Sequence, residues 1–109
     1  MIEVMLLRNT GRSTLMMREK DIELKLKKEV EKIGGLSLKF TSPGTAGVPD
    51  RLVLLPKGKS GFVELKAIGK KLRPLQIKRK EQLEALGFQV YVIDDISQIG
   101  GILDEIQST

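Results

Sequence analysis

The chain has 109 residues, a net charge of +5, and neither cysteine nor histidine. The missing cysteines exclude disulfides, thiolate metal sites and cysteine nucleophiles, and the missing histidines exclude Ser-His-Asp catalysis and nearly every zinc enzyme site. Its length suits one domain, no apolar run approaches the ~20 residues of a membrane span, and no signal peptide is recognisable. We therefore expect a cytoplasmic protein whose chemistry comes from Asp, Glu, Lys, Arg, Ser, Thr or Tyr, with a metal ion as the source of an activated water.

The pattern of apolar residues predicts one domain over 17–109. Residues 1–16 show little periodicity and are interpreted as an N-terminal extension with no predicted element. From Met17 to Ile33 apolar residues recur every three or four positions, which indicates a helix that Gly34 ends. After it we predict strands over 36–40, 52–55 and 62–67, a helix over 74–86, a strand over 88–93 and a helix over 96–106. The order α-β-β-β-α-β-α indicates an α/β sandwich around one sheet.

Two acids and a lysine stand where the second and third strands are predicted. Asp50 ends the segment Gly47-Val48-Pro49-Asp50, Glu64 follows fourteen residues later, and Lys66 comes two positions after Glu64. If the residues between them form a hairpin, all three side chains can converge at one edge of the sheet. Paired carboxylates suit Mg²⁺, which takes oxygen ligands and keeps several waters. The added lysine favours a site that cleaves phosphodiesters.

Strand geometry places Glu64 and Lys66 on the same face, because alternate residues of a strand point to the same side. The neighbouring strands read as buried on both sides, so this charged pair would be unfavourable without a compensating cation and phosphate. The alternative is that Asp50 is only a turn residue and that Glu64 and Lys66 form a simple ion pair.

Three further side chains are candidates on the predicted helices. Glu19 falls at the centre of the apolar stripe of the first helix, and Glu23 borders it. Glu19 is the stronger candidate, although an acid at a helix N-terminus is also favoured by the helix dipole alone. Gln76 lies in the first turn after Pro74, where its amide could contact a phosphate or a ligand water.

Positive charge is concentrated between Lys57 and Lys80. This segment has nine basic residues and one acid, a net charge of +8, so the rest of the chain carries −3. Such a block beside a metal site is typical of proteins that bind a polyanion, and the alternative is a lysine-rich surface that serves solubility. The candidate DNA-binding residues are Lys57, Lys59, Lys70, Lys71, Arg73, Lys78, Arg79 and Lys80.

Short motifs in a fixed order cover nearly the whole chain from Met17 to Ile106. They are Gly34-Gly35-Leu36, Lys39-Phe40, Ser42-Pro43-Gly44, Gly47-Val48-Pro49-Asp50-Arg51, Phe62-Val63-Glu64-Leu65-Lys66, Pro74-Leu75-Gln76 and Gly87-Phe88. In this series the chain closely resembles the VRR-NUC domain, a member of the PD-(D/E)xK nuclease superfamily. The resemblance implies a restriction-endonuclease-like fold with a central mixed sheet flanked by helices.

The resemblance also implies roles for the candidate residues. Asp50 and Glu64 would be metal ligands for Mg²⁺ or Mn²⁺, Lys66 the catalytic lysine, and Gln76 a neighbour of the site. The backbone carbonyl of Leu65 is a further candidate ligand, and Glu19 would be the helix acid that binds a second ion or acts through water. Stand-alone bacterial and phage members of the family resemble compact homodimers that cut branched DNA such as four-way junctions.

We therefore expect a metal-dependent DNA endonuclease, a homodimer acting on branched duplex DNA in a bacterial cytoplasm, or in the host cytoplasm if the chain is phage-encoded. Two other classes stay open. One is a DNA-binding module of nuclease ancestry without turnover, and the other is an interaction subunit whose basic face meets an acidic partner.

Overall fold

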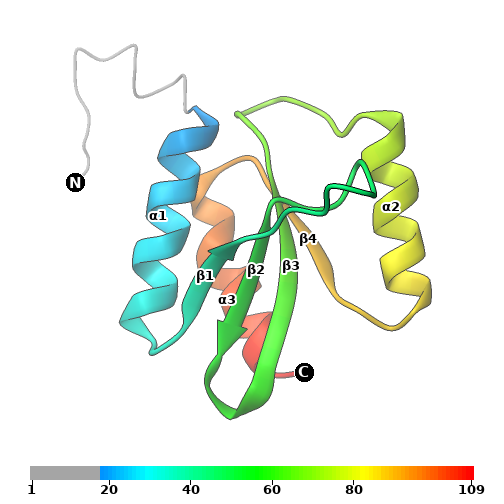
Figure 1. The fold of residues 1–109 in the computed structure, drawn as a ribbon. Helices are drawn as coiled ribbons and strands as arrows, with labels where there is room; N and C mark the ends of the chain where they lie inside the picture. The colour runs from blue at the N-terminus through cyan, green and yellow to red at the C-terminus, as the bar shows by residue number, and fades with distance from the viewer. Residues whose placement is uncertain (1–17) are drawn as a thin grey trace, which may run out of the picture.

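The computed structural model describes residues 18–109, so the predicted N-terminal extension over 1–16 lies outside the described residues. The elements follow the predicted order α-β-β-β-α-β-α (Figure 1). They are α1 (Glu19–Lys32), β1 (Leu36–Lys39), β2 (Arg51–Leu55), β3 (Lys59–Leu65), α2 (Pro74–Ala85), β4 (Val90–Ile93) and α3 (Ile99–Gln107), with 3₁₀ turns η2 (Pro56–Gly58) and η3 (Ile96–Gln98). No helix among these residues has the length and apolar character that a membrane crossing requires.

The four strands form one mixed sheet in the order β1-β2-β3-β4. The β1–β2 and β2–β3 pairs are antiparallel, whereas β3 and β4 are parallel and joined through α2. A row of partners crosses the whole sheet from Leu38 through Leu52 and Phe62 to Val90. The predicted α/β fold with a mixed sheet is therefore confirmed.

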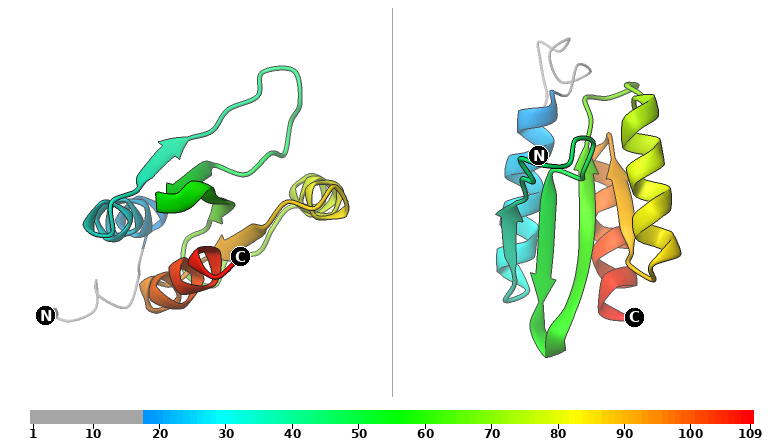
Figure 2. Two further views of the ribbon diagram at one scale, coloured as in Figure 1. Left: turned by 90° about the horizontal axis from the view of Figure 1, so that it is seen from below. Right: turned by 45° about the vertical axis from the view of Figure 1, so that its right-hand side comes forward.

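The core lies between one face of the sheet and the helices α1 and α3. The apolar stripe of α1 is buried there, and α3 packs beside it on the same face (Figure 2). The buried residues are Ile22, Leu26, Val30, Val53, Leu55, Val63, Leu65, Ile93, Ile99, Leu103 and Ile106. The periodicity that predicted the first and last helices therefore identifies real core residues.

The opposite face of the sheet is covered much less. The helix α2 lies beside β4, away from α1 and α3 (Figure 2), so Leu36 and Leu38 on β1 stay 55% and 43% exposed. The prediction that the middle strands are buried on both sides is wrong, because Leu52 and Leu54 of β2 face this outer side and are only half-buried. A continuous apolar run in the sequence indicates a strand inside the sheet, but it does not show whether another element covers both faces of that strand.

Several element boundaries also differ from the prediction. The third strand starts at Lys59, because the β2–β3 turn is completed by Lys57 and Gly58 in left-handed backbone conformations. It ends at Leu65, so Lys66 lies just beyond the strand. The fourth strand starts at Val90, and Phe88, which is 53% exposed, lies outside it. The last helix is preceded by the separate turn η3.

Candidate active site

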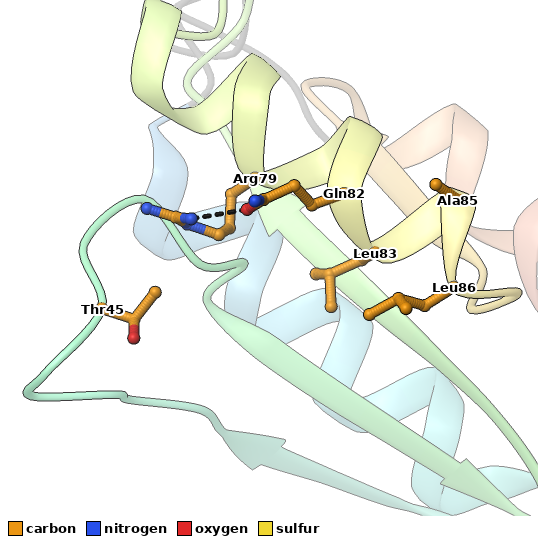
Figure 3. A pocket seen from close by; sticks show the side chains of 6 residues that line it. All are labelled: Thr45, Arg79, Gln82, Leu83, Ala85 and Leu86. Atoms are coloured by element: carbon orange, nitrogen blue, oxygen red, sulfur yellow. Dashed lines mark hydrogen bonds between the residues drawn. The ribbon is translucent and has the colours of Figure 1, made fainter.

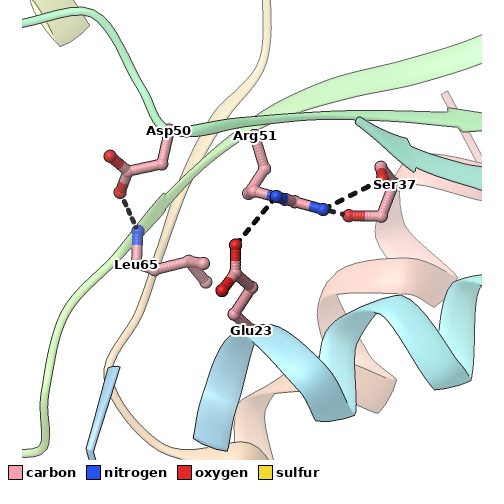
Figure 4. Close-up of polar contacts among 5 residues, drawn as sticks. All are labelled: Glu23, Ser37, Asp50, Arg51 and Leu65. Atoms are coloured by element: carbon pink, nitrogen blue, oxygen red, sulfur yellow. Dashed lines mark hydrogen bonds and ion pairs between the residues drawn. The ribbon is translucent and has the colours of Figure 1, made fainter. Parts of the chain in front are cut away.

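The register of the β2–β3 hairpin places Asp50 and Glu64 side by side. Arg51 pairs with Val63, and in an antiparallel ladder the next step brings Asp50 opposite Glu64. The backbone N–H of Leu65 donates a hydrogen bond to Oδ2 of Asp50 over 2.9 Å (Figure 4). The backbone carbonyl of Asp50 accepts from Phe40 N–H over 2.7 Å. The Asp50 carboxylate is thus held in place at the start of β2.

Glu64 is a buried carboxyl group on β3, with only 4% of its surface exposed. The Gln76 side-chain amide donates to its Oε2 over 2.6 Å, and the Gln76 carbonyl oxygen accepts from Arg73 N–H over 2.9 Å. Burial and the neighbouring Asp50 raise the pKa of Glu64 from 4.5 to about 7, against the opposing effect of Lys66. Without a cation, the site therefore holds two acids that are unfavourable to ionise together.

Lys66 supplies a positive charge on the same edge of the sheet. Its Nζ lies 3.9 Å from Oε2 of Glu64, and its side chain is 12% exposed. Its backbone N–H donates to the Ile93 carbonyl over 2.9 Å, which continues the β3–β4 pairing past the end of β3. This ion pair is long, so the lysine is not fully engaged by Glu64 and its ammonium can also interact with a bound phosphate.

The two helix acids have different surroundings. Glu19 is the first residue of α1 and is exposed. Partial burial and the charge of Asp50 raise the pKa of Glu19, which places its carboxyl group in the electrostatic field of the site. Glu23 instead accepts a hydrogen bond from Arg51 Nη1 over 2.8 Å (Figure 4). The charge of Asp50 therefore acts on Glu19, whereas Glu23 is paired with an arginine.

The loop before Asp50 is fixed against the start of α2. Gly47 has φ +84°, and a Cβ at this position would lie 2.8 Å from the Leu75 carbonyl oxygen. Arg79 Nε donates to the Ala46 carbonyl over 2.9 Å. A hollow lined by Thr45, Arg79, Gln82, Leu83, Ala85 and Leu86 opens between this loop and α2 (Figure 3). None of the candidate site acids lines the hollow, so it is separate from the acidic pair.

The donor set fits a hard divalent cation with few protein ligands. Within residues 18–109, no group of three or more His, Cys, Asp or Glu side chains is arranged to hold a metal ion. Asp50 and Glu64 nevertheless provide adjacent carboxylates whose like charges a cation would neutralise. Proteins commonly bind Mg²⁺ through one or two carboxylates, and the ion retains several waters.

The structure separates the candidate DNA-binding residues into two groups. The loop from β3 to α2 carries Lys70, Lys71 and Arg73, and Lys78 follows on α2; all four are exposed. This loop follows the end of β3 at which Glu64 and Lys66 lie. Lys57 in the β2–β3 turn and Lys59 at the start of β3 lie at the opposite end of this strand. Arg79 is engaged by Ala46, and Lys80 forms a 2.9 Å ion pair with Glu84.

Sequence reasoning missed Arg51 and Ser37 as neighbours of the site. Arg51 is 6% exposed and donates to the Ser37 hydroxyl and carbonyl in addition to Glu23. A signal was present, because Arg51 occupies an inward position of an apolar strand, where an unpaired cation would be costly. Its partners could not be read from the sequence, since they lie on two other elements.

The chain is similar to a known protein and to a solved structure. No protein-family model matches the chain. The chain is 55% identical over 86 residues to "Putative nuclease p44" of Acyrthosiphon pisum secondary endosymbiont phage 1, a match that covers 77% of this chain and 92% of that protein. A solved structure described as "VRR_NUC domain" superposes with a TM-score of 0.75 at 31% identity, covering 81% of this chain and 96% of the other.

Proposed function

Because the chain belongs to the VRR-NUC family, we propose that it is a metal-dependent DNA endonuclease that hydrolyses phosphodiester bonds at the Asp50–Glu64 pair. One observation carries the proposal: a buried Glu64 lies opposite Asp50, with the Lys66 ammonium 3.9 Å away. A simple ion pair with Lys66 would need only Glu64. Asp50 is a second acid beside it that raises the pKa of Glu64, and two such like charges are favourable together only when a cation neutralises them.

The proposed cofactor is Mg²⁺ or Mn²⁺, held by Asp50, Glu64 and the backbone carbonyl of Leu65. Glu19 would bind a second ion or act on the first through water. A cation bound there would polarise a phosphate oxygen of the substrate and lower the pKa of a bound water. The oxygen-only donor set and the like charges of the two acids support this choice.

The protein's own groups have defined tasks in the proposed reaction. Leu65 N–H fixes the Asp50 carboxylate, and the Gln76 amide fixes Glu64. Lys66 orients the attacking water or stabilises the negative charge that develops on the phosphate. Because these groups are held by backbone or buried contacts, they need little rearrangement when the substrate binds.

The proposed substrate is DNA, and branched duplexes such as four-way junctions are the preferred form. Lys70, Lys71, Arg73 and Lys78 are exposed on the loop and helix that follow the site strand. Lysine and arginine contacts to phosphates give affinity without base specificity. The phenylalanines do not form a base-stacking platform at the site, because Phe40, Phe62 and Phe88 pack against one another, with centroids 5.3 and 6.1 Å apart.

We further propose a homodimer, since cutting both strands of a symmetric junction needs two sites. The uncovered outer face of the sheet supports it, because it presents Leu36, Leu38 and Phe88, which are 43–55% exposed. Contiguous exposed apolar side chains can mark a protein interface. Light scattering should give a dimer that Leu38→Glu disrupts and Leu24→Glu, at an exposed leucine of α1, does not. A wild-type monomer at micromolar concentration with full junction cleavage would contradict the dimer.

The proposed activity is tested by incubating supercoiled plasmid and a synthetic four-way junction with the protein in Mg²⁺, Mn²⁺ or EDTA. We expect cleavage with either metal, no cleavage in EDTA, and faster cleavage of the junction. Binding without cleavage under every condition would instead identify a DNA-binding module. Cleavage that persists in EDTA would contradict the metal requirement.

A further inference from the structure

Arg51 is a buried cation immediately beside the candidate active site but on the other face of β2. It follows Asp50 directly, and because side chains alternate along a strand, it points toward α1 while Asp50 points toward Leu65 (Figure 4). Only 6% of Arg51 is exposed. A buried guanidinium is unfavourable unless its donors are satisfied, so the partners of Arg51 indicate what it is there to hold.

Those partners lie on two other elements of the fold. Nη1 donates to Oε2 of Glu23 on α1 over 2.8 Å. Nη2 donates to the carbonyl oxygen of Ser37 on β1 over 3.0 Å, and Nε donates to the Ser37 hydroxyl over 3.3 Å. Arg51 therefore connects one helix and two strands at the end of the sheet that holds Asp50 and Glu64.

The ion pair is one helical turn away from Glu19. Residues four apart lie on the same face of a helix, so a tie at Glu23 fixes the direction in which Glu19 projects. Apolar packing holds the first turn of α1 through Ile22 alone, because Arg18, Glu19 and Lys20 are exposed. The contact between Glu23 and Arg51 adds a polar tie one residue later and so helps to set the position of Glu19.

The tie joins α1 to the sheet in the absence of a cation. Glu19 begins α1, one helical turn before Glu23, and Asp50 directly precedes Arg51. A helix that is already held against the sheet needs less rearrangement when a cation binds, so less binding free energy is lost.

We propose that Arg51 is a positioning residue that, through Glu23 and Ser37, holds the first turn of α1 so that Glu19 contributes to metal binding beside Asp50. The inference rests on the proposed function, since it needs a cation at the Asp50–Glu64 pair. It assigns Glu23 and Arg51 no contact with the substrate or the cation.

The test is isothermal titration of the full-length protein with Mn²⁺ up to millimolar concentration. Glu23→Gln keeps the shape and removes the charge that pairs with Arg51, so Mn²⁺ affinity should fall about tenfold, at the lower end of the effects known for outer-shell partners. Arg51→Lys should weaken Mn²⁺ binding similarly, because lysine cannot reproduce the fork that bonds two partners. Glu31→Gln, which removes an exposed acid paired with Lys27 on the same helix, should bind Mn²⁺ like wild type.

The decisive comparison is made in a Glu19→Gln background. If Arg51 and Glu23 act through Glu19, adding Glu23→Gln to Glu19→Gln should cause no further loss of Mn²⁺ affinity. An equal loss in both backgrounds, or wild-type Mn²⁺ affinity in Glu23→Gln and Arg51→Lys, would overturn the inference. Thermal melts identify any variant that does not fold. If Arg51→Lys does not fold, the milder Glu23→Gln variant still allows the comparison.

Failure of this inference is distinguishable from failure of the proposed function. If the function is wrong, Asp50→Asn should leave the Mn²⁺ affinity of the protein unchanged. If only the positioning role is wrong, Asp50→Asn should abolish Mn²⁺ binding while Glu23→Gln has no effect on it.

Discussion

The side-chain amide of Gln76, on the first turn of α2, donates a 2.6 Å hydrogen bond to Glu64 on β3. Its carbonyl oxygen meanwhile accepts from the Arg73 backbone, so the amide orientation is fixed at both ends. Gln76 is itself 8% exposed. The Gln76 amide occupies one side of the buried Glu64 carboxylate. The remaining lone pairs of Glu64 are therefore free to face Asp50 and the candidate cation.

Gln76→Ala should lower metal-dependent cleavage about tenfold without unfolding the protein, because Glu64 loses the group that orients it. The measurement is single-turnover cleavage of a four-way junction at saturating protein. Gln82→Ala is the matched control, since Gln82 is an exposed glutamine of the same helix whose side chain contacts Arg79. Equal rates for Gln76→Ala and Gln82→Ala would show that Gln76 does not support the site.

The raised pKa of Glu64 predicts a stability change with pH in the absence of metal. Between pH 4.5 and about 7 the folded protein binds more protons at Glu64 than the unfolded chain does, so stability falls as the pH rises through this range. Glu64→Gln, which resembles the neutral acid, should therefore be about 1–3 kcal/mol more stable than wild type at pH 8 in EDTA. The difference should vanish below about pH 4.5.

Urea unfolding at several pH values measures this effect, with the exposed Glu81→Gln as control. A Glu64→Gln protein that is less stable than wild type at pH 8 would mean that the ionised carboxylate is favourable in the fold. The acid would then be structural.

Lys66→Ala should reduce cleavage by about 10²–10³-fold, the range found when a group that stabilises transition-state charge is removed. Its Mn²⁺ affinity, measured by isothermal titration, should stay within about threefold of wild type, because the ammonium acts on water and phosphate. Lys28→Ala, at an exposed lysine of α1, provides the control. Loss of Mn²⁺ binding together with activity would instead make Lys66 a structural partner of Glu64.

Reversing Lys70 and Lys71 to glutamate should weaken DNA binding and flatten its dependence on salt. Each lost phosphate contact reduces the slope of log affinity against log salt by about 0.9, so two contacts change it by about 2. Fluorescence anisotropy with a labelled junction, in an Asp50→Asn background that prevents cutting, measures the slope. The double reversal of Lys27 and Lys28 on α1 should leave the salt slope unchanged. An equal effect of both pairs would mean that net charge, and not contacts by Lys70 and Lys71, determines DNA affinity.

Local patterns predicted the architecture and the approach of Asp50 to Glu64, whose roles remain predictions. The period of the apolar residues identified the helices and strands, and the predicted hairpin was enough to bring Asp50 and Glu64 together. The network around Arg51 could not be predicted in this way. Its partners Glu23 and Ser37 are 28 and 14 residues away in sequence, and only the packing of α1 on the sheet makes them neighbours.

Sequence proximity was also a poor guide to the charged surface. Lys57 and Lys59 belong to the same basic block as Lys70 and Lys71, yet β3 runs between them and places them at opposite ends of the sheet. A strand rises about 3.3 Å per residue, so a block of this length does not form a single patch. The DNA-binding role of Lys57 and Lys59 remains a prediction for a separate region of the surface.

The most direct test of the central claim compares wild type with Asp50→Asn in one junction-cleavage assay with Mn²⁺. Asn keeps the size of Asp50 and can still accept the Leu65 hydrogen bond, but it removes the ligand charge. Cleavage should fall by at least about 10²-fold, while Asp104→Asn, at an exposed aspartate of α3, should cut at the wild-type rate. Asp50→Asn cutting the junction as fast as wild type would contradict the assignment of this site.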